Sequence, residues 1–254
     1  MAKKDTSWEE VEGWYSSCVG EKGHYYHQTL ILPNALRLLG IKKSPPSSVL
    51  DIGCGQGVFA RALPPETIYC GVDYSPSLIE EAKRQTRRAS FTFYHADATQ
   101  PLPVEKTDFD CAIFLLSLQN MEHQDAAIAN ARKHLKKGGR LLLVLNHPCF
   151  RIPRQSSWGI DEASKQQYRR IQRYMSSMKI PIQMNPGKGN QSAETFSFHH
   201  SLSDTIGFLS KAHFSLTGLE EWCSNKKSEG AKAKMEDRAR SEIPLFLALL
   251  ARAE

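Results

Sequence analysis

The sequence has no apolar run of about 18 residues, so it predicts no membrane-spanning helix. Its first residues are basic, but no apolar segment follows them as it would in a secretory signal. Six cysteines are scattered without a C-x-x-C pair, which disfavours a zinc site or a disulfide framework. Internal repeats and low-complexity tracts are missing as well. We therefore expect a globular, cytoplasmic protein with no metal site.

A Walker phosphate-binding loop is also missing, because no G-x-x-x-x-G-K-[ST] pattern occurs. The chain instead has V-L-D-I-G-C-G-Q-G at 49–57, an apolar run that ends in an acid and three glycines at alternate positions. This pattern predicts a buried strand that breaks into a tight turn against a ligand. Glycine suits such a turn because it tolerates positive φ and lets backbone N–H groups approach a bound molecule.

From Ser48 onward, segments with strand character alternate with segments with helix character. The expected strands are 48–53, 68–73, 91–97, 110–117 and 140–145, and the expected helices are 58–63, a helix opened by Ser75-Pro76, and 125–135. Asp51, Asp73 and Asp97 lie at or near the ends of the first three strands. Strands separated by helices of this length imply a parallel sheet with right-handed crossovers.

The alternation stops for about fifty residues after the fifth strand. We expect a helix over 163–176 and a hairpin formed by 179–184 and 195–199, with Pro181 restricting that hairpin to an edge. A helix at 203–212, a strand at 215–222, a charged stretch and a last strand at 244–250 complete the chain. Before the core, residues 8–40 are expected to be helical and 44–47 to be a linker.

The formal net charge of +6 is concentrated in one segment. Residues 150–201 contain eight Lys and Arg but only three Asp and Glu, whereas 51–149 and 202–254 are each balanced. A basic segment of this kind suggests an anionic ligand, an acidic surface or nucleic acid. A solvated basic helix would give the same pattern.

The dinucleotide-binding fingerprint is the first candidate for the glycine turn, since it also has an acid about 20 residues later. It fits imperfectly, because its third glycine should stand at Val58 and Gly57 comes one residue early. The arrangement more closely resembles the class I S-adenosylmethionine-dependent methyltransferases. The resemblance rests on Asp51-Ile52-Gly53-Cys54-Gly55-Gln56-Gly57, on Asp73 and on Asp97-Ala98, and it covers roughly 48–145 and 202–250.

This resemblance implies an α/β fold with a Rossmann-like, mainly parallel seven-stranded sheet. The last strand would be antiparallel, helices would cover both faces, and a lid would be inserted after strand five. The implied organisation is an N-terminal helical cover (1–47), a methyltransferase core (48–148 and 201–254) and an inserted lid or acceptor-binding segment (149–200).

The implied cofactor is S-adenosyl-L-methionine, with S-adenosyl-L-homocysteine as its product. Asp73 would accept hydrogen bonds from the ribose hydroxyls, Asp97 from the adenine amino group, and Asp51 would meet the cationic amino-acid end. The implied cofactor-binding residues are Asp51, Gly53, Cys54, Gly55, Gln56, Gly57, Asp73, Tyr74, Asp97, Ala98 and Leu116.

The acceptor is expected to be a small molecule, because cover and lid are similar to those of the ubiquinone and menaquinone biosynthesis methyltransferases. A basic lid with aromatic residues suits an anionic or quinol-like aromatic acceptor, and a quinol would imply peripheral contact with a membrane. His147, at a strand end, is the candidate base. The candidate acceptor-binding residues are Tyr25, Tyr26, Gln119, Met121, His147, Trp158, Tyr168 and His199.

Three other functions stay open at this point. The pI near 9 is the argument for an RNA methyltransferase, although no RNA-binding module is visible and no stable nucleic-acid partner is expected. A non-catalytic protein that binds S-adenosylmethionine would keep the same turn and acids. A nucleotide-dependent dehydrogenase would differ in binding NAD.

Overall fold

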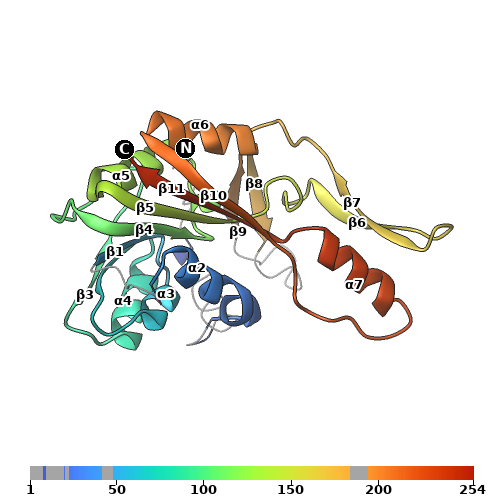
Figure 1. Ribbon diagram of the computed structural model, residues 1–254, viewed down its shortest axis with the longest axis horizontal. Coiled ribbons are helices and arrows are strands. Elements are labelled where there is room, and N and C mark those ends of the chain that lie inside the picture. The colour runs from blue at the N-terminus through green and yellow to red at the C-terminus, as the bar shows by residue number, and fades with distance from the viewer. Residues whose placement is uncertain (1–7, 10–19, 21–22, 42–47, 184–193) are drawn as a thin grey trace.

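The computed structural model describes residues 8–9, 20, 23–41, 48–183 and 194–254. The expectations for 10–19, for the linker at 44–47 and for the turn at 187–190 lie outside these residues. Figure 1 shows a central sheet with helices above and below it, and further elements gathered at one end.

The sheet has seven strands in the order β10-β11-β5-β4-β1-β2-β3. Its strands are β1 (Ser48–Ile52), β2 (Ile68–Asp73), β3 (Phe91–His95), β4 (Phe109–Leu115), β5 (Leu135–Asn146), β10 (Phe214–Trp222) and β11 (Phe246–Ala253). Pairing is parallel except for β11, which is antiparallel to both β5 and β10. The predicted fold class, a Rossmann-like sheet with an antiparallel last strand, is therefore confirmed.

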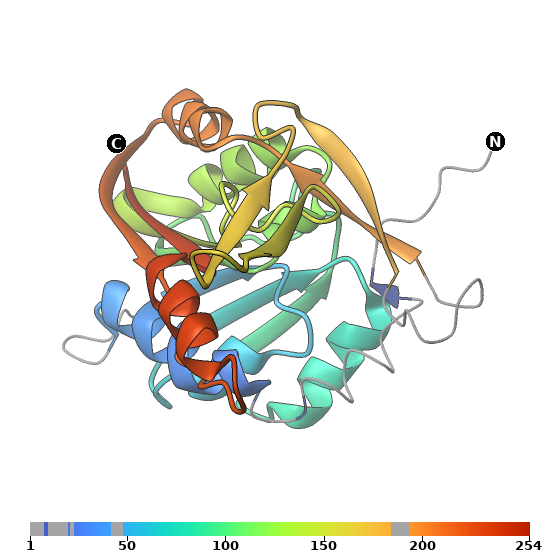
Figure 2. The same cartoon turned by 90° about the vertical axis from the view of Figure 1, so that its right-hand side faces the viewer.

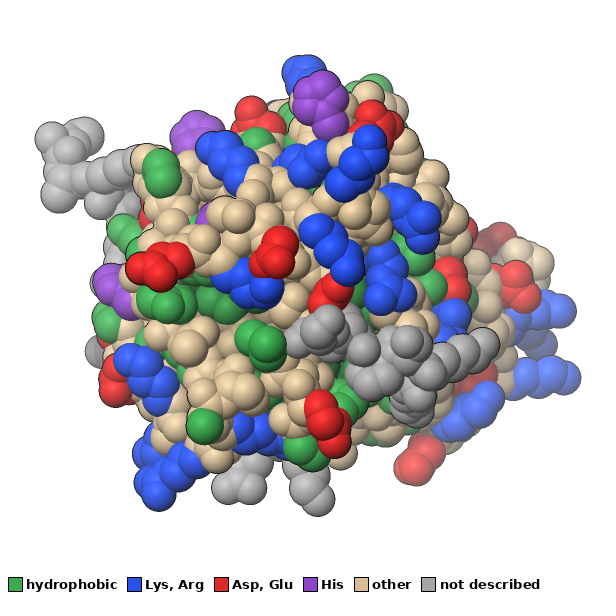
Figure 3. Space-filling view, turned by 60° about the vertical axis from the view of Figure 1, so that its left-hand side comes forward, with side chains coloured by type: hydrophobic (Ala, Val, Ile, Leu, Met, Phe, Trp, Pro, Cys, Tyr) green, Lys and Arg blue, Asp and Glu red, His purple; other side chains and the backbone are tan. Residues whose placement is uncertain are grey.

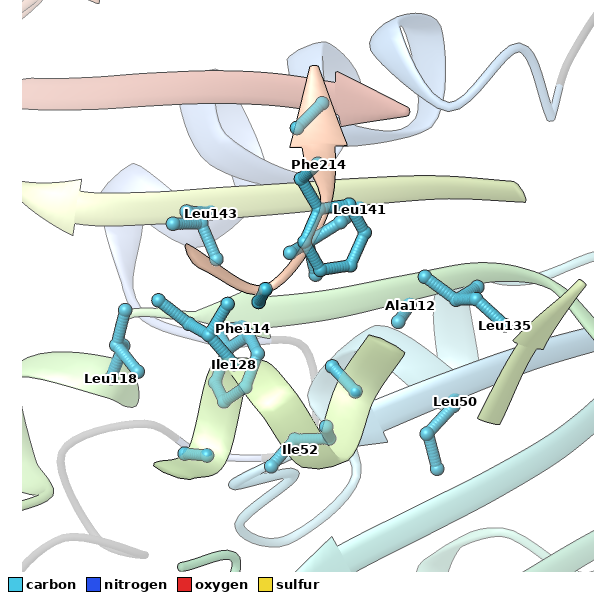
Figure 4. Packing of buried hydrophobic residues seen from close by; sticks show 14 of the residues in the cluster. Leu50, Ile52, Ala112, Phe114, Leu118, Ile128, Leu135, Leu141, Leu143 and Phe214 are labelled. Carbon is cyan, nitrogen blue, oxygen red and sulfur yellow. The ribbon is translucent and has the colours of Figure 1, made fainter. Parts of the chain in front are cut away.

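Two apolar layers cover the faces of the sheet. Strands buried on both faces are nearly continuous in apolar residues, as parallel sheets require, and every residue of β1 is buried. In Figure 1, α5 and α6 cover one face, while α2, α3 and α4 cover the other. Figure 4 shows the first layer, in which Phe114, Ile128, Leu143 and Phe214 pack against one another between the sheet and α5.

The helices begin where the sequence places their capping residues. Ser75 accepts a hydrogen bond from the Leu78 N–H at the start of α4, and Ser201 forms a capping box with Asp204 at the start of α6. The helices are η2 (His27–Ile31), α2 (Leu32–Leu38), α3 (Val58–Ala62), α4 (Pro76–Gln85), η3 (Leu118–Asn120), α5 (Gln124–His134), α6 (Leu202–Lys211) and α7 (Ala233–Glu242).

Strand β5 starts earlier than predicted. It begins at Leu135, which pairs with Phe109, and the next pair joins Arg140 to Cys111. Lys136 to Gly139, expected as a turn before the strand, instead form an irregularity within it, with Gly138 at a φ of 75°.

The helix predicted over 163–176 is wrong. Strands β6 (Ser156–Asp161) and β7 (Gln166–Ile171) form an antiparallel hairpin there. Burial along β7 alternates with a period of two, because Gln167, Arg169 and Ile171 are half-buried and their neighbours are exposed. The turn is stabilised by Asp161, whose Oδ1 accepts a hydrogen bond from the Ala163 N–H at 3.0 Å.

The second hairpin of the insertion is confirmed. Strands β8 (Met178–Gln183) and β9 (Glu194–His199) form a separate two-stranded sheet, in which Pro181 stands opposite Phe196. Since β11 runs toward the left of Figure 1 and is antiparallel to β5, the parallel strands end on the right, where α7 and the β6–β7 hairpin lie. Figure 2 looks onto this end and shows the hairpins and α7 in front of the sheet.

No helix among the described residues combines the length and apolar character needed to cross a bilayer. Figure 3 views the molecule from the side away from the β6–β7 hairpin, and basic side chains lie there among acidic ones.

Candidate functional site

The glycine turn between β1 and α3 requires glycine for steric reasons. Gly53 has a φ of 76°, and a Cβ atom there would lie only 2.3 Å from Cβ of Ser117. Ser117 follows β4 and donates a hydrogen bond to the Ile52 carbonyl at 2.6 Å. The close approach of these two segments therefore excludes any side chain at Gly53. Gly57, with a φ of 77°, begins α3 in the left-handed conformation.

Asp73, at the end of β2, holds this turn in place. Its Oδ2 accepts a hydrogen bond from the Gly55 N–H at 2.8 Å, and its Oδ1 accepts one from the Ser75 N–H at 2.9 Å. Burial raises the pKa of Asp73, and these backbone hydrogen bonds oppose the shift. A carboxylate offers about four lone pairs, so each oxygen can accept a further hydrogen bond from a ligand hydroxyl.

Asp51 lies deeper, within β1. The Tyr69 hydroxyl donates a hydrogen bond to its Oδ2 at 2.7 Å, whereas its Oδ1 has no partner among the described residues. Burial raises the pKa of Asp51 to about 7; the Tyr69 hydrogen bond opposes this shift, and the charge of Asp73 adds to it. Tyr69 is a functional candidate that sequence reasoning missed, since an apolar strand does not show on which face its tyrosine meets an acid.

The other residues of the turn are buried. Cys54 donates a weak hydrogen bond to the Gly55 carbonyl at 3.6 Å, and burial raises the pKa of its thiol. The Gln56 amide donates to the Gly20 carbonyl at 3.2 Å, which ties an N-terminal segment to the turn. Glu9 makes a second tie, because its carboxylate accepts a hydrogen bond from the Ser77 N–H at 3.2 Å.

Asp97 and Ala98 follow β3 at the same edge of the sheet. Asp97 Oδ1 accepts hydrogen bonds from the N–H and hydroxyl groups of Thr99, at 2.8 and 2.7 Å. Asn130 on α5 fixes the segment by donating to the Ala98 carbonyl at 2.8 Å and to the Gln100 carbonyl at 2.7 Å. Sequence reasoning missed Asn130, although a polar residue on the buried face of an amphipathic helix is a usable signal.

Tyr74 marks the outer limit of this edge. Its side chain is exposed, its ring lies 6.0 Å from the His95 ring, and its carbonyl is within hydrogen-bond distance of His95 Nε2. The structure therefore brings Asp51, Asp73 and the glycine turn into one cluster, with Tyr74 at its solvent side.

The segment after β4 carries backbone strain at the same place. Leu116 has a φ of 58°, which is uncommon for a residue with a branched side chain. Gln119 follows in η3, and its Oε1 is buried without a partner among the described residues. The Met121 side chain reaches the turn, since its Cε would lie 3.3 Å from a Cβ at Gly53.

His147 follows β5 and is fully engaged by neighbours. Its Nε2 lies 2.7 Å from Glu221 Oε1, and its Nδ1 accepts a hydrogen bond from the Cys149 N–H at 3.2 Å. This pattern places the proton of the neutral ring on Nε2. Burial lowers the pKa of His147, against the effect of Glu221. Both ring nitrogens are thus engaged by the protein, and the role of base stays a prediction.

The remaining candidates for acceptor binding are Tyr25, Tyr26, Trp158, Tyr168 and His199. The Tyr26 hydroxyl forms a hydrogen bond with the Ser224 hydroxyl at 2.7 Å, and its ring packs against Phe246. The ammonium group of Lys226 lies over the rings of both Tyr25 and Tyr26. Trp158, in the β6–β7 hairpin, lies within cation–π distance of Arg151 and Arg169.

Tyr168 and His199 are the last two of these candidates. Tyr168 is exposed and covers Gly159, on the face of the hairpin opposite to Trp158, because neighbouring positions of a strand alternate. His199 is buried, with Nε2 within 2.8 Å of the Tyr174 carbonyl. The structure does not bring either residue to the glycine turn. No group of three potential metal ligands occurs in the described part of the chain.

Comparison with known proteins agrees with this geometry. Residues 49–139 match the family described as a methyltransferase domain. A ubiquinone/menaquinone biosynthesis C-methyltransferase of Rhizobium etli is 32% identical over 114 residues, which are 42% of this chain and 44% of that protein. An O-methyltransferase of Pyrenophora dematioidea is 31% identical over 118 residues, or 43% of this chain and 44% of the relative. The chain thus spans less than half the length of these relatives.

Solved structures resemble the chain over a larger part of its length. An S-adenosylmethionine-dependent methyltransferase from Mesorhizobium loti superimposes with a TM-score of 0.64 at 22% identity, covering 86% of this chain and 96% of that one. The amino pentose methyltransferase CalS10 from Micromonospora echinaspora gives a TM-score of 0.61 at 14% identity, covering 99% and 100%. At these identities the likeness establishes the fold.

Proposed function

We propose that the chain transfers a methyl group from S-adenosylmethionine to a small-molecule acceptor, because residues 49–139 match a methyltransferase domain and the fold is that of S-adenosylmethionine-dependent methyltransferases. The observation that carries this proposal is the direct hydrogen bond between Asp73 and the Gly55 N–H. It joins the acid that would hold a ribose to the turn that would hold the rest of the donor.

The residues present fit this donor. The free Oδ1 of Asp51 is a buried acceptor suited to a cationic amino group or to a water bound to it. Asp73 retains acceptor capacity for two hydroxyls. When bound, the donor supplies a methyl group activated by its positively charged sulfur. Asp97 and the buried Gln119 Oε1 are further acceptors at the same edge.

The contribution of the chain to the reaction is orientation. Methyl transfer is an in-line displacement, so holding donor and acceptor in line can supply a large part of the acceleration. Met121 reaches the turn from the segment after β4, and the positive φ of Leu116 sets the direction of that segment, so we propose that Leu116, Gln119 and Met121 face the acceptor. Since His147 is engaged by Glu221 and Cys149, we propose an acceptor that needs no base at that position.

We further propose that 1–47 cover the donor, that 149–200 bind the acceptor, and that the acceptor is aromatic, quinol-like or anionic. Two observations support this organisation: Glu9 and Gly20 reach the donor side, and the hairpins stand at the carboxyl ends of the strands. A quinol acceptor would add peripheral contact with a membrane.

Binding and transfer can be tested separately. Calorimetric titration with S-adenosylhomocysteine should show one site, and Asp73→Ala should abolish it while Asp108→Asn, an exposed acid away from the turn, leaves it unchanged. A screen of small phenols, quinols and carboxylates with radiolabelled donor then tests transfer. Binding of NAD instead of S-adenosylhomocysteine would refute the proposal, and binding without transfer to any acceptor would favour a non-catalytic protein.

A further inference from the structure

Two guanidinium groups lie close to one indole ring in the insertion. The Arg151 Cζ lies 5.1 Å from the Trp158 ring centroid, and the Arg169 Cζ lies 5.2 Å from it. Trp158 and Arg169 are direct cross-strand partners in β6–β7, so the hairpin register itself places this pair side by side. Both distances are within the range of cation–π attraction.

Each of the two guanidinium groups is held along one edge. Backbone carbonyl oxygens hold both, and a hydroxyl oxygen also holds Arg169. Arg169 donates from Nε to the Phe150 carbonyl at 2.8 Å and from Nη2 to the Ser156 hydroxyl at 2.7 Å. Arg151 donates from Nε to the Pro244 carbonyl at 3.3 Å, with a longer contact from Nη2 to Ile243. The Nη1 groups have no such partner in the described part of the chain, which leaves donors on both arginines for a ligand.

The positive charge of this pair is not neutralised by the protein. No Asp or Glu among the described residues forms an ion pair with Arg151 or Arg169, whereas exposed bases such as Lys83 and Lys136 do have acidic partners. Burial, and then the charge of Arg169, lower the pKa of Arg151 to about 10. Two half-buried like charges without a counter-ion raise the free energy of the empty protein, and a bound anion would relieve this.

The pair lies on the acceptor side of the candidate site. Phe150, whose carbonyl binds Arg169, packs against His147 directly after β5, with ring centroids 4.8 Å apart. Tyr26 and Cys223 lie close enough to influence the pKa of Arg151. The subsite is therefore placed where β5, β10 and the start of β11 meet.

We propose that Arg151, Trp158 and Arg169 form a subsite for an oxyanion, a carboxylate or a phosphate, attached to a planar acceptor; this inference rests on the proposed methyl transfer. Planar guanidinium forks match the geometry of carboxylate and phosphate oxygens, and they also stack on aromatic faces. Arg170 and Arg173 are exposed and lie outside the subsite, although the sequence groups them with Arg169.

The test uses the full chain with S-adenosylhomocysteine present and three probes: benzoate, phenyl phosphate and the neutral analogue benzamide. Binding is measured by calorimetry, and quenching of the fluorescence of Trp158 locates it by comparison with Trp158→Phe. We expect one of the two anions to bind and benzamide not to bind. The preferred anion distinguishes a carboxylate acceptor from a phosphate acceptor.

Arg151→Gln and Arg169→Gln should each weaken anion binding by about ten-fold to a hundred-fold, as expected for the loss of a charged hydrogen bond. Arg170→Gln, the next residue on the opposite face of the strand, is the matched control and should change it less than two-fold. Arg169→Lys keeps the charge and should recover part of the affinity. Absence of anion binding in the wild-type chain, or equal losses in Arg170→Gln, would overturn the proposal.

The two proposals fail in different ways. If S-adenosylhomocysteine binds and neither anion does, the subsite is refuted while methyl transfer stands. If the anions bind as expected but S-adenosylhomocysteine does not, the donor site is refuted. If Arg169→Gln lowers the melting temperature and the lysine variant restores stability without restoring binding, the pair only pins the hairpin, and the subsite is also refuted.

Discussion

The buried carboxyl of Asp51 makes the stability of the empty protein depend on pH, and Asp51→Asn should remove this dependence. Asp51 is 1% exposed, and its pKa in the folded chain is about 7 against 3.8 for the unconstrained side chain. Because the folded-state value is the higher one, its stabilising effect is complete below pH 4 and is lost as the pH rises through 7.

The size of this effect follows from the shift. Each pH unit between the two pKa values changes the free energy of unfolding by about 1.4 kcal/mol, so the full loss is on the order of 4 kcal/mol. Between pH 5 and pH 7 about 2 kcal/mol of this is lost, which corresponds to about 4–8 °C in melting temperature for a chain of this size. Asparagine does not titrate and can still accept the hydrogen bond of Tyr69.

The assay is thermal unfolding of both proteins without ligand from pH 5 to pH 8. The difference in melting temperature, variant minus wild type, should increase steadily with pH, since only the wild type loses stability through this group. Other titrating residues, Asp73 among them, are present in both proteins and largely cancel in the difference. Parallel curves for the two proteins would show that Asp51 is ionised throughout and would refute the reasoning.

Three other changes have definite expected outcomes. Gly53→Ala should destabilise the chain by several kcal/mol in urea unfolding, through contact with Ser117, whereas Gly138→Ala has equally positive φ but open space and should cost only about 1 kcal/mol. Asn130→Ala leaves two carbonyl groups after β3 without a donor and should cost about 1–3 kcal/mol by the same measurement, with weaker binding of S-adenosylhomocysteine. His147→Asn should lower the melting temperature but leave the shape of the pH–rate profile unchanged; loss of one limb of that profile would restore His147 as a base.

The sheet and the donor side could be predicted because they depend on local patterns. Strands buried on both faces are continuous in apolar residues, and the acids that follow them meet at one edge whatever the packing details. The direction of a side chain inside such a strand has no comparable signal. For this reason the sequence predicted Asp51 as a ligand residue but not its burial against Tyr69.

The insertion was harder to predict because its half-buried positions are polar. In β7 the inward residues include Gln167 and Arg169, so alternation of apolar and polar residues, the usual sign of a strand, is missing. The arginine side chain instead covers Trp158 with its guanidinium, a pairing that only the hairpin register establishes. Arg169 and Arg170, neighbours in the sequence, consequently lie on opposite faces of the strand.

The place of β11 in the sheet has a consequence for the order of folding. This strand follows every other strand in the chain, yet it lies between β5 and β10 and pairs with both. Until it is inserted, β5 presents a long, unpaired apolar edge, and β10 has no neighbour. Leu245, the residue just before β11, is also tied to the end of β5, because its carbonyl accepts a hydrogen bond from the His147 N–H. A folding intermediate that lacks β11 could therefore already have a formed glycine turn, but it would be prone to aggregate through the open edge of β5.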